Sequence, residues 1–241
     1  MLGEKNKELL KEGAKTYKII LSNEQTEKFS QFARLLVEWN EKMNLTAITD
    51  PEEIVIKHFL DSLSIAELIP NETKTLVDVG TGAGFPGIPL KIIKENLKVT
   101  LLDSLAKRIN FLNEVCNSLM LKDILAVHSR AEDFGTDPNF RESFDFAVAR
   151  AVAGLPVLLE YCLPLVKVGG IFIAMKGPDG REELEESRKA LDVLGGDIED
   201  TYFFTLPYSN IERCLIKVRK CRHTPTKYPR KSGIPTKNPI K

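Results

Sequence analysis

The feature that most constrains the fold is an alternation of short apolar runs with amphipathic stretches after residue 72. The apolar runs read TLVDVG, KVTLLD, ILAVHS, FDFAVARA and GIFIAMKG, and helical patterns such as 105–119 and 156–167 separate them. Strands that alternate with helices form a parallel sheet covered on both faces. With 241 residues, 43% of them apolar, the chain can bury such a core. The sequence therefore predicts an α/β protein.

The elements near the end of the sequence differ from this alternation. Beyond an acidic helix expected near 181–194, the β-like runs TYFFTLP and RCLIKVRK are separated by only a few residues. A parallel crossover needs a longer connection, so these runs should pair as an antiparallel hairpin. Five parallel strands closed by a hairpin resemble the methyltransferases that use S-adenosylmethionine (AdoMet). We therefore expect an α/β, Rossmann-like AdoMet-dependent methyltransferase fold, with a mostly parallel seven-stranded sheet whose last strand is antiparallel.

The residues before 72 have helical patterns instead. Ser22 and Gln25 match a capping box ahead of apolar residues at helical spacing, and Asp50 and Pro51 match the start of a second helix. These helices predict a layer that precedes the sheet. The expected organisation is an N-terminal helical extension (1–72), an AdoMet-binding domain (73–220) and a basic tail (221–241) packed on or flanking that domain.

Several classes of protein are disfavoured by composition. The first residues, MLGEKNKELLKEG, contain no apolar signal core, and no apolar stretch reaches the roughly 18 residues that cross a bilayer. We therefore expect a cytoplasmic protein without a membrane partner. A monomer is expected as well, although these sequence features do not determine the oligomeric state. The cysteines form no C-x-x-C pair and the three histidines lie far apart, so no metal site is expected. The four thiols should be buried: Cys116, Cys162, Cys214 and Cys221.

The glycine-rich stretch LVDVGTGAGFPGIPL, residues 76–90, allows two interpretations. In the first, Gly82, Gly84 and Gly87 satisfy the dinucleotide pattern G-x-G-x-x-G. Asp103 lies about twenty residues further on, where an acid would bind a ribose in such a protein. This interpretation predicts a nicotinamide-dependent oxidoreductase.

In the second interpretation, Gly80, Gly82 and Gly84 form G-x-G-x-G, and Asp78 lies two places ahead. The first interpretation would put Asp78 inside a strand, where an unpaired carboxylate is costly to bury. In a methyltransferase, Asp78 would instead orient the loop and face the ammonium group of AdoMet, while the glycines let the backbone approach the methionine part. Asp103 would accept hydrogen bonds from both ribose hydroxyls. We therefore favour AdoMet as the cofactor.

Charge is unevenly distributed although the net charge is zero. From Arg213 to Lys241 there are ten Lys and Arg and no Asp or Glu, so residues 1–212 carry a net charge of minus ten. This asymmetry indicates a polyanionic partner, with a solvated terminus as the alternative. Removal of 222–241 should weaken RNA binding and leave AdoMet binding nearly unchanged. The expected RNA-binding residues are Lys176, Arg222, Lys227, Arg230, Lys231 and Lys237.

Longer motifs carry a closer resemblance, in order from about residue 22 onward. They are WNEKMNLTAITDPEEIVIKHFLDSL, DVGTGAGFPGIPL, LLDSLAKRINFL, SRAEDF, ARAVA and YPRKSGIPTKNP. The chain resembles the bacterial small-subunit ribosomal RNA guanine-N7 methyltransferase family, also called GidB or RsmG. The resemblance implies methylation of N7 of one guanine in 16S rRNA, as free rRNA or in a ribosomal subunit. It also implies cofactor contacts from Gly80, Phe85, Asp103, Ser104, Leu105, Ala131, Glu132 and Arg150.

Some of these positions also have a physical interpretation. Glu132 follows the third strand, where the adenine ring of a cofactor that lies across the strand ends would be found. The alternative is that Glu132 is a loop carboxylate exposed to water. Phe85 is either an apolar wall for the cofactor or part of the core. Arg150 ends the fourth strand, where a guanidinium can hold a carboxylate or a phosphate, or form a structural ion pair.

The chemistry follows from what the sequence lacks. No Pro-Cys pair provides a nucleophile for methylating a pyrimidine carbon, and no Asp/Asn-Pro-Pro motif follows the fourth strand, as is usual for exocyclic amines. Guanine N7 has a free lone pair and no proton to lose, so its methylation needs placement rather than a general base. We therefore assign no catalytic residue, and the candidates are Arg150, His58 and Asp61. His58 and Asp61 share one helix face, where they either lie near the target base or form a capped or core polar pair.

Two other functions remain open from the sequence. One is an AdoMet-dependent methyltransferase for a small molecule or a protein, which the basic tail disfavours. The other is an RNA-binding module without activity, which the intact Asp78, glycines and Asp103 disfavour.

Overall fold

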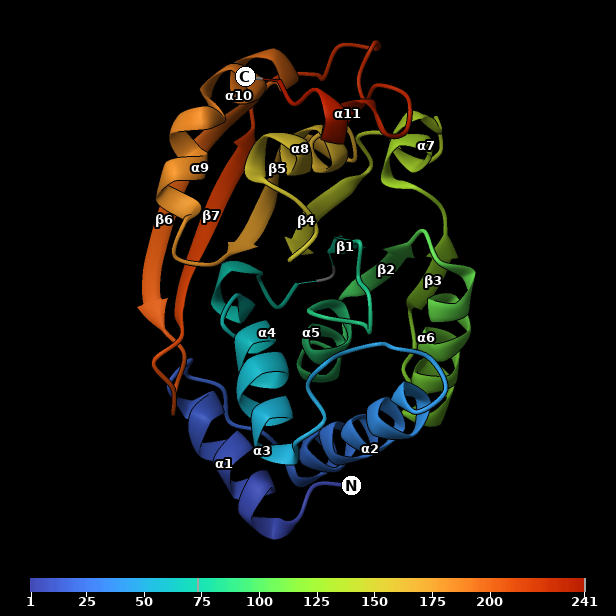
Figure 1. The fold of residues 1–241 in the computed structure, drawn as a ribbon, viewed down its shortest axis with the longest axis vertical. Helices are drawn as coiled ribbons and strands as arrows, with labels where there is room; N and C mark the ends of the chain where they lie inside the picture. Colours follow the sequence, from blue (N-terminus) through green and yellow to red (C-terminus); the bar gives the residue numbers. More distant parts are fainter. Residues whose placement is uncertain (73, 241) are drawn as a thin grey trace.

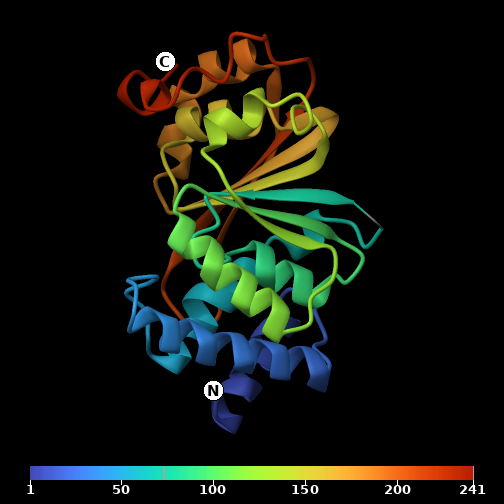
Figure 2. The ribbon, with the colours of Figure 1, turned by 90° about the vertical axis from the view of Figure 1, so that its right-hand side faces the viewer.

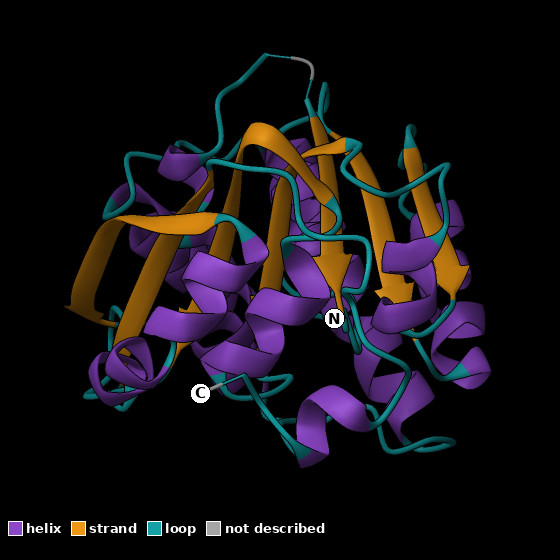
Figure 3. Cartoon of the chain, turned by 90° about the horizontal axis from the view of Figure 1, so that it is seen from above, coloured by secondary structure: helices purple, strands orange, loops and turns teal. Residues whose placement is uncertain are grey.

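The computed structural model describes residues 1–72 and 74–240. Within this part of the chain, the sheet has the strand order β3-β2-β1-β4-β5-β7-β6 (Figure 1). Figure 3 shows the strands side by side in the view from above. Strands β1 to β5 run parallel, and β7 is antiparallel to both of its neighbours. The strands are β1 (Thr75–Val79), β2 (Lys98–Asp103), β3 (Ile124–His128), β4 (Phe144–Arg150), β5 (Val166–Lys176), β6 (Gly196–Thr205) and β7 (Glu212–Lys220). The predicted methyltransferase fold and its closing hairpin are confirmed.

Helices cover both faces of the sheet, and the two termini lie on opposite faces (Figure 1 and Figure 2). One face carries α1 (Glu4–Lys15), α2 (Asn23–Asn40), α3 (Pro51–Ile54), a π-helix (Val55–Leu60), α4 (Asp61–Leu63), a 3₁₀ turn (Ala66–Leu68), α5 (Gly87–Ile93) and α6 (Ala106–Ser118). The other face carries α7 (Ala131–Thr136), α8 (Leu155–Cys162), α9 (Gly180–Glu186), α10 (Arg188–Leu194) and α11 (Ile234–Lys237).

The N-terminal helices share one core with the sheet. Phe29 and Phe32 of α2 pack on Phe59 of the π-helix, with ring centroids 4.9 and 5.6 Å apart. The same apolar cluster includes Leu76 of β1 and Val148 of β4. The predicted boundary at 72/73 falls beside a residue outside the described part of the chain. The N-terminal helices are therefore a layer on the sheet, and the division into three parts stays a prediction.

Three local expectations are wrong. The helix expected over 156–167 ends at Cys162, because Pro164 cannot donate a backbone hydrogen bond and β5 begins at Val166. The acidic helix is broken at Ser187, whose hydroxyl donates to the carbonyl of Glu183 (2.6 Å). Cys221 is exposed because it lies just beyond the end of β7, whereas the other three cysteines are buried as expected.

The structure also contains a helix that the sequence analysis did not predict. Helix α1 is rich in charged residues, and it packs through Leu10 and Ala14, which are fully buried. In the described residues, none of the helices is both long enough and apolar enough to cross a membrane.

The capping box at the start of α2 is formed as predicted. The Ser22 hydroxyl accepts from the Gln25 amide (3.1 Å), and the Gln25 side chain accepts from the Ser22 amide (3.0 Å). Ser22→Ala should lower the free energy of unfolding by about 1 kcal/mol, because it leaves an amide of the first turn unpaired. Urea denaturation measures this change. The control is Ser118→Ala, at the partly exposed end of α6, whose free energy of unfolding should stay within about 0.5 kcal/mol of the parent value. Equal losses of stability in both variants would exclude a capping effect.

Candidate functional site

Asp78, near the end of β1, holds the glycine-rich loop that follows the strand. Its side chain is fully buried, and Oδ2 accepts hydrogen bonds from the Thr81 hydroxyl (2.7 Å) and the Gly87 amide (2.8 Å). Among the described residues, no donor reaches the other oxygen, Oδ1, which is also buried. Burial raises the pKa of Asp78 to about 6, against the effect of its two hydrogen bonds. Asp78 therefore orients the loop, and Oδ1 remains able to accept a bond from a ligand.

Asp103, the last residue of β2, fixes the same loop from the neighbouring strand. Its Oδ2 accepts from the Gly82 amide (2.9 Å), and its Oδ1 accepts from the Leu105 amide (2.9 Å). Arg108 forms an ion pair with the carboxylate at 3.2 Å. The side chain is 2% exposed. Asp103 therefore has a structural role in this loop, and its contact with a ribose stays a prediction.

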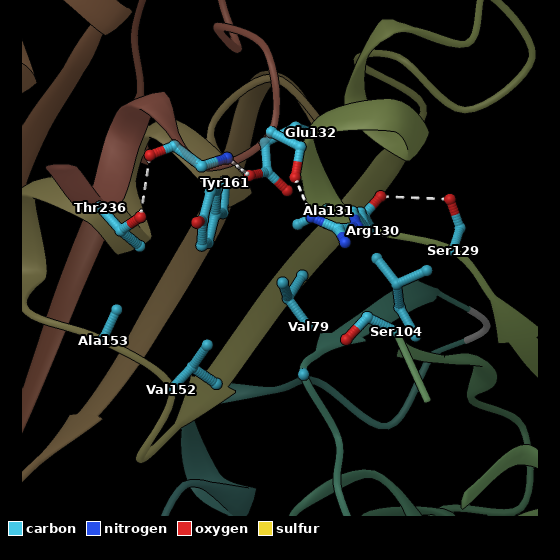
Figure 4. A pocket seen from close by; sticks show the side chains of 14 residues that line it. Val79, Ser104, Ser129, Arg130, Ala131, Glu132, Val152, Ala153, Tyr161 and Thr236 are labelled. Carbon is cyan, nitrogen blue, oxygen red and sulfur yellow. Dashed lines mark hydrogen bonds between the residues drawn. The ribbon is translucent and has the colours of Figure 1, made fainter. Parts of the chain in front are cut away.

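A hollow of about 390 Å³ opens at the carboxyl ends of the parallel strands. Gly80 after β1 and Ser104 after β2 line it, together with Ala131 and Glu132 at the start of α7 (Figure 4). We call it the glycine-loop hollow. It lies where the strand order changes direction between β1 and β4, the position at which open α/β sheets bind their ligands. Four of the predicted cofactor contacts are thus brought together.

One side of the hollow, formed by α7, α8 and the basic tail, includes several polar groups. Glu132 is 7% exposed, and its Oε1 accepts a hydrogen bond from the backbone amide of Gly233 (3.1 Å). Burial, followed by the nearby charge of Glu132, raises the pKa of Tyr161 to about 12, so this hydroxyl stays protonated. Ser232 and Thr236 also line the hollow. Three residues of the basic tail therefore line this hollow, and the expectation that removal of 222–241 leaves AdoMet binding nearly unchanged stays a prediction.

A second hollow, of about 370 Å³, lies at the ends of β4 and β5. Its lining includes Lys57 and His58 from the π-helix, Arg150 from β4, and Lys176 from β5. We call it the Arg150 hollow. Its other charged lining residues are Asp61, Asp179, Glu183 and Arg213. The hollow thus offers several donors and acceptors within one volume.

Asp61 organises this second hollow. Its carboxylate is 2% exposed and forms two ion pairs, from Oδ2 to Arg150 (2.9 Å) and from Oδ1 to Arg213 (2.9 Å). Arg150 also donates to the carbonyl of Lys57 (3.2 Å). The two guanidinium groups come from β4 and β7, so the ion pairs fix the helical layer against two strands. Arg150 and Asp61, two of the three candidate catalytic residues, are therefore in direct contact.

His58, the third candidate, is neutral in this environment. Burial, with the charge of Arg150 second, lowers the pKa of His58 to about 3. Its Nε2 lies 3.0 Å from the Thr46 hydroxyl, and its Nδ1 lies 3.4 Å from a guanidinium nitrogen of Arg150. A histidine with so low a pKa is a weak base. The ring therefore supports Arg150 rather than removing protons at neutral pH.

Phe85 lies behind Arg150, inside the core. Its ring stacks on His58 and on Phe32, with centroids 4.5 and 5.0 Å apart, and the Arg150 guanidinium lies 5.0 Å from its centroid. The side chain is 4% exposed and does not line the glycine-loop hollow. The structure thus gives Phe85 a packing role, and its contact with a cofactor stays a prediction.

The loop of residues 151–154 borders both hollows. Ala151 lines the Arg150 hollow with φ +56°, a left-handed conformation that is uncommon for residues other than glycine. Val152 lines the other hollow and covers Gly80, where an added Cβ would come within 2.7 Å of a Val152 methyl group. Lys176 holds the loop by donating to the Ala153 carbonyl (2.8 Å). A ligand in either hollow therefore meets this loop.

The glycine-loop hollow fits the AdoMet predicted from the sequence. The orphaned Oδ1 of Asp78 suits a cationic donor such as an ammonium group; Asp78 is buried and does not itself line the hollow, but the next residue, Val79, does. Gly82 has φ +60°, and a Cβ built there would meet no atom closer than 4.0 Å, so the backbone is open to a ligand. Ser104 and Glu132 can hydrogen-bond to ribose and adenine groups. The volume lies in the range of small-molecule sites.

The other predicted cofactor contacts lie outside the lining of this hollow: Asp78, Gly82, Gly84, Phe85, Asp103, Leu105 and Arg150. Leu105 is exposed just before α6, and an added Cβ at Gly84 would come within 2.5 Å of Ile88, so Gly84 allows close packing of the loop. Arg150 lines the other hollow. The roles of these residues toward a cofactor stay predictions.

The predicted RNA-binding residues fall into two groups. Arg222 pairs with Asp192, Arg230 pairs with Glu160, and Lys176 pairs with Glu183. Lys227, Lys231 and Lys237 are exposed, and within residues 1–72 and 74–240 no carboxylate pairs with them. The second group is the more available for phosphate contacts.

Sequence reasoning missed several residues of the glycine-loop hollow. These are Ser129, Arg130, Val152, Ala153, Tyr161, Ser232, Gly233 and Thr236. Tyr161 lies on a helix whose buried face reads as core, so nothing in its pattern marks it. The tail residues stand in PRKSGIPTK, whose basic and Pro-rich composition indicates an extended surface segment.

Comparisons with known proteins agree with this fold. The family model described as rRNA small subunit methyltransferase G matches residues 25–211. The ribosomal RNA small subunit methyltransferase G of Acetivibrio thermocellus is 61% identical in sequence, and the match covers 98% of this chain and 97% of that protein. The protein of the same name from Alkaliphilus metalliredigens is 53% identical, and the match covers 98% of this chain and 99% of that protein. The structure of M. jannaschii TYW2 in complex with AdoMet has a TM-score of 0.51 at 15% identity, over 85% of this chain and 80% of that chain. The structure of P. horikoshii TYW2 in complex with MeSAdo has a TM-score of 0.53 at 17% identity, over 66% and 61%.

The pKa of Asp78 predicts how AdoMet binding depends on pH. Only the ionised carboxylate attracts an ammonium group, and with a pKa of about 6 its ionised fraction rises about tenfold between pH 5 and 7. AdoMet affinity should therefore rise by up to about tenfold over this range. Calorimetry measures it. Asp78→Asn should bind more weakly with a flatter profile, and an identical profile in both proteins would show that Asp78 does not face the cofactor.

Removal of the Asp103 carboxylate should affect both the loop and the cofactor. Asp103→Ala should weaken AdoMet binding by roughly ten- to a hundredfold, the range for losing charged hydrogen bonds. Hydrogen exchange at the Gly82 amide should become faster, because its acceptor is gone. Asp197→Ala, at an exposed acid on β6, is the control and should change neither quantity. An unchanged affinity with faster exchange would limit Asp103 to its structural role.

Proposed function

Since this chain belongs to the rRNA small subunit methyltransferase G family, we propose that it transfers the methyl group of AdoMet to N7 of one guanine in the 16S rRNA of the small ribosomal subunit. The observation that carries the proposal is the pair of hollows that border one loop, 151–154, at the carboxyl end of the sheet. One suits AdoMet, and the other, lined by charged groups, suits a nucleotide. AdoMet supplies an electrophilic methyl group on a positively charged sulfur.

Two polar residues that line the glycine-loop hollow, and Asp78 next to its lining residue Val79, would hold the cofactor. Asp78 would bind the ammonium group through Oδ1, which has no partner among the described residues. Ser104, after β2, would hydrogen-bond near the ribose, and Glu132 would bind the edge of the adenine ring. The buried position of Asp78 favours such a contact, because an ammonium group would stabilise its ionised form.

The Arg150 hollow would hold the guanine. The edges of a guanine carry the O6 acceptor and N–H donors, so a base there needs both cations and carboxylates. Arg150 and Lys176 provide donors, and the exposed Asp179 provides an acceptor. The ion pairs of Asp61 hold Arg150 in place, which favours a fixed orientation of the base. Extrusion of the guanine from its stack would bring N7 to this position.

The proposed reaction needs no general base. N7 attacks through a lone pair and loses no proton, so the residues must align the reactants and exclude water. His58, with a pKa of about 3, is too weak a base to take part at neutral pH. This agrees with a reaction that depends on placement.

The RNA would lie across the carboxyl end of the sheet. Lys227, Lys231 and Lys237 of the basic tail are exposed and suit phosphate contacts. A ribosomal substrate also implies that the protein acts in the cytoplasm, and we propose that it acts there as a monomer.

Analysis of the methylated nucleoside tests the proposal. The protein is incubated with labelled AdoMet and 16S rRNA or small ribosomal subunits, and the RNA is digested to nucleosides. Label in 7-methylguanosine is expected. Under saturating AdoMet, the single-turnover rate should show no steep change between pH 6 and 8, because no catalytic base titrates there. Label in a methylated pyrimidine, in adenosine or in protein would overturn the proposal.

A further inference from the structure

Part of the basic tail forms a wall of the glycine-loop hollow. Ser232, Gly233 and Thr236 line the hollow, and Thr236 belongs to α11, which packs on α8. Figure 4 shows Thr236 near Tyr161, on the same side of the hollow as Glu132. We call residues 230–237 the tail wall. This segment therefore meets whatever occupies the hollow.

A buried carboxylate anchors the tail wall. Glu160 of α8 is fully buried, and Arg230 binds both of its oxygens, with Nε 2.9 Å from Oε1 and Nη2 2.6 Å from Oε2. The Arg230 amide also donates to Glu160 Oε1 (2.8 Å), and its guanidinium donates to the carbonyl of Asn238 (2.8 Å). A buried carboxylate needs such a partner, since an unpaired charge is costly there. The anchor thus fixes the tail wall at both of its ends.

The tail wall also contacts the residue predicted to bind adenine. Gly233 donates its amide to Glu132 (3.1 Å), at a backbone φ of +82° that favours glycine. Arg130 donates to the Ser232 hydroxyl, and the Thr236 hydroxyl donates to the Gly233 carbonyl (3.1 Å). The position of Glu132 therefore depends on the tail wall.

The same segment presents cations to solvent. Lys231 precedes Ser232, and Lys237 follows Thr236, and both lysines are exposed. No ion pair with either lysine exists among the described residues, although other tail cations are paired. Within eight residues, the tail wall thus combines residues that line the hollow with lysines that are exposed to solvent.

We propose that the tail wall is a binding element for AdoMet and that it couples AdoMet binding to RNA binding. RNA phosphates on Lys231 and Lys237 hold the segment in the position in which Ser232, Gly233 and Thr236 contact the cofactor. Each ligand then raises the affinity of the other, because both bind the docked segment better than a released one. The coupling rests on the RNA substrate proposed above, whereas the contact with AdoMet does not.

The contact with AdoMet is tested by calorimetry on the full-length protein without RNA. Thr236→Trp places an indole against the hollow and should weaken AdoMet binding by roughly tenfold or more. Thr226→Trp is the matched control, because Thr226 is an exposed tail residue outside the hollow, and it should bind as the parent does. Equal affinity in the two variants would overturn the contact.

The anchor is tested with a pair of changes. Arg230→Gln alone leaves Glu160 buried without its cation and can destabilise the fold. The double variant Arg230→Gln/Glu160→Gln removes both charges, so it releases the tail wall and leaves no uncompensated charge. AdoMet affinity of the double variant should fall by at least about threefold at an unchanged melting temperature. Parent-like affinity in a folded double variant would contradict a role for the anchored segment.

Coupling is tested by measuring AdoMet affinity with and without saturating small ribosomal subunits. The AdoMet affinity of the parent protein should rise by at least about fivefold when subunits are present. The gain is the ratio of each protein's own affinities with and without subunits, and Lys231→Gln/Lys237→Gln should lose most of it. An equal gain in parent and variant would overturn coupling through these lysines. If subunits do not bind the parent at all, the proposed substrate fails and the coupling with it, while the Thr236→Trp comparison still decides the contact with AdoMet.

Discussion

The buried carboxylate of Asp61 is the interaction on which the second half of the site depends. It lies on a helix of the N-terminal layer and binds two arginines that come from β4 and β7. Loss of one partner of such a buried pair typically costs about 3–5 kcal/mol, because the remaining charge is left uncompensated. The ion pairs therefore hold the layer, the two strands and the ring of His58 in one arrangement. The guanidinium of Arg150 is fixed from several directions before any substrate arrives.

The two hollows have different structural origins. The glycine-loop hollow belongs to the sheet, since Asp78 and Asp103 end adjacent strands and tie the loop to them. The Arg150 hollow exists only because the N-terminal helices pack beside β4 and β5. In the proposed function, the sheet thus supplies the cofactor site, and the N-terminal helices supply a place for the second reactant.

Much of the fold could be predicted because its strands are local features of the sequence. A parallel strand buried on both faces reads as a continuous apolar run, as FDFAVAR does in β4, and the short gap before β7 allows only a hairpin. Helix α1 was missed because its charged residues outnumber the buried ones, so its stability comes from packing of Leu10 and Ala14. The break at Ser187 depends on one side-chain hydrogen bond, which composition does not reveal.

The site could be predicted only where it follows strand ends. Gly80, Ser104 and Glu132 come directly after strands or their loops, so topology alone brings them to one edge. The contact of Glu132 with Gly233 joins residues 101 positions apart, and the anchor of Arg230 joins residues 70 positions apart. Such contacts depend on the path of the tail over the folded sheet. Its basic composition indicated a partner outside the protein, and the folded chain uses part of that charge itself.

The position of the tail wall has a consequence for the order in which the protein becomes functional during synthesis. Residues 230–237 are made after every strand of the sheet. The strands can therefore pair while one side of the glycine-loop hollow is still missing, whereas the apolar core that includes Ile240 and the Glu160–Arg230 ion pair are completed only with the tail. A nascent chain would acquire its complete cofactor site as one of the last steps of its maturation.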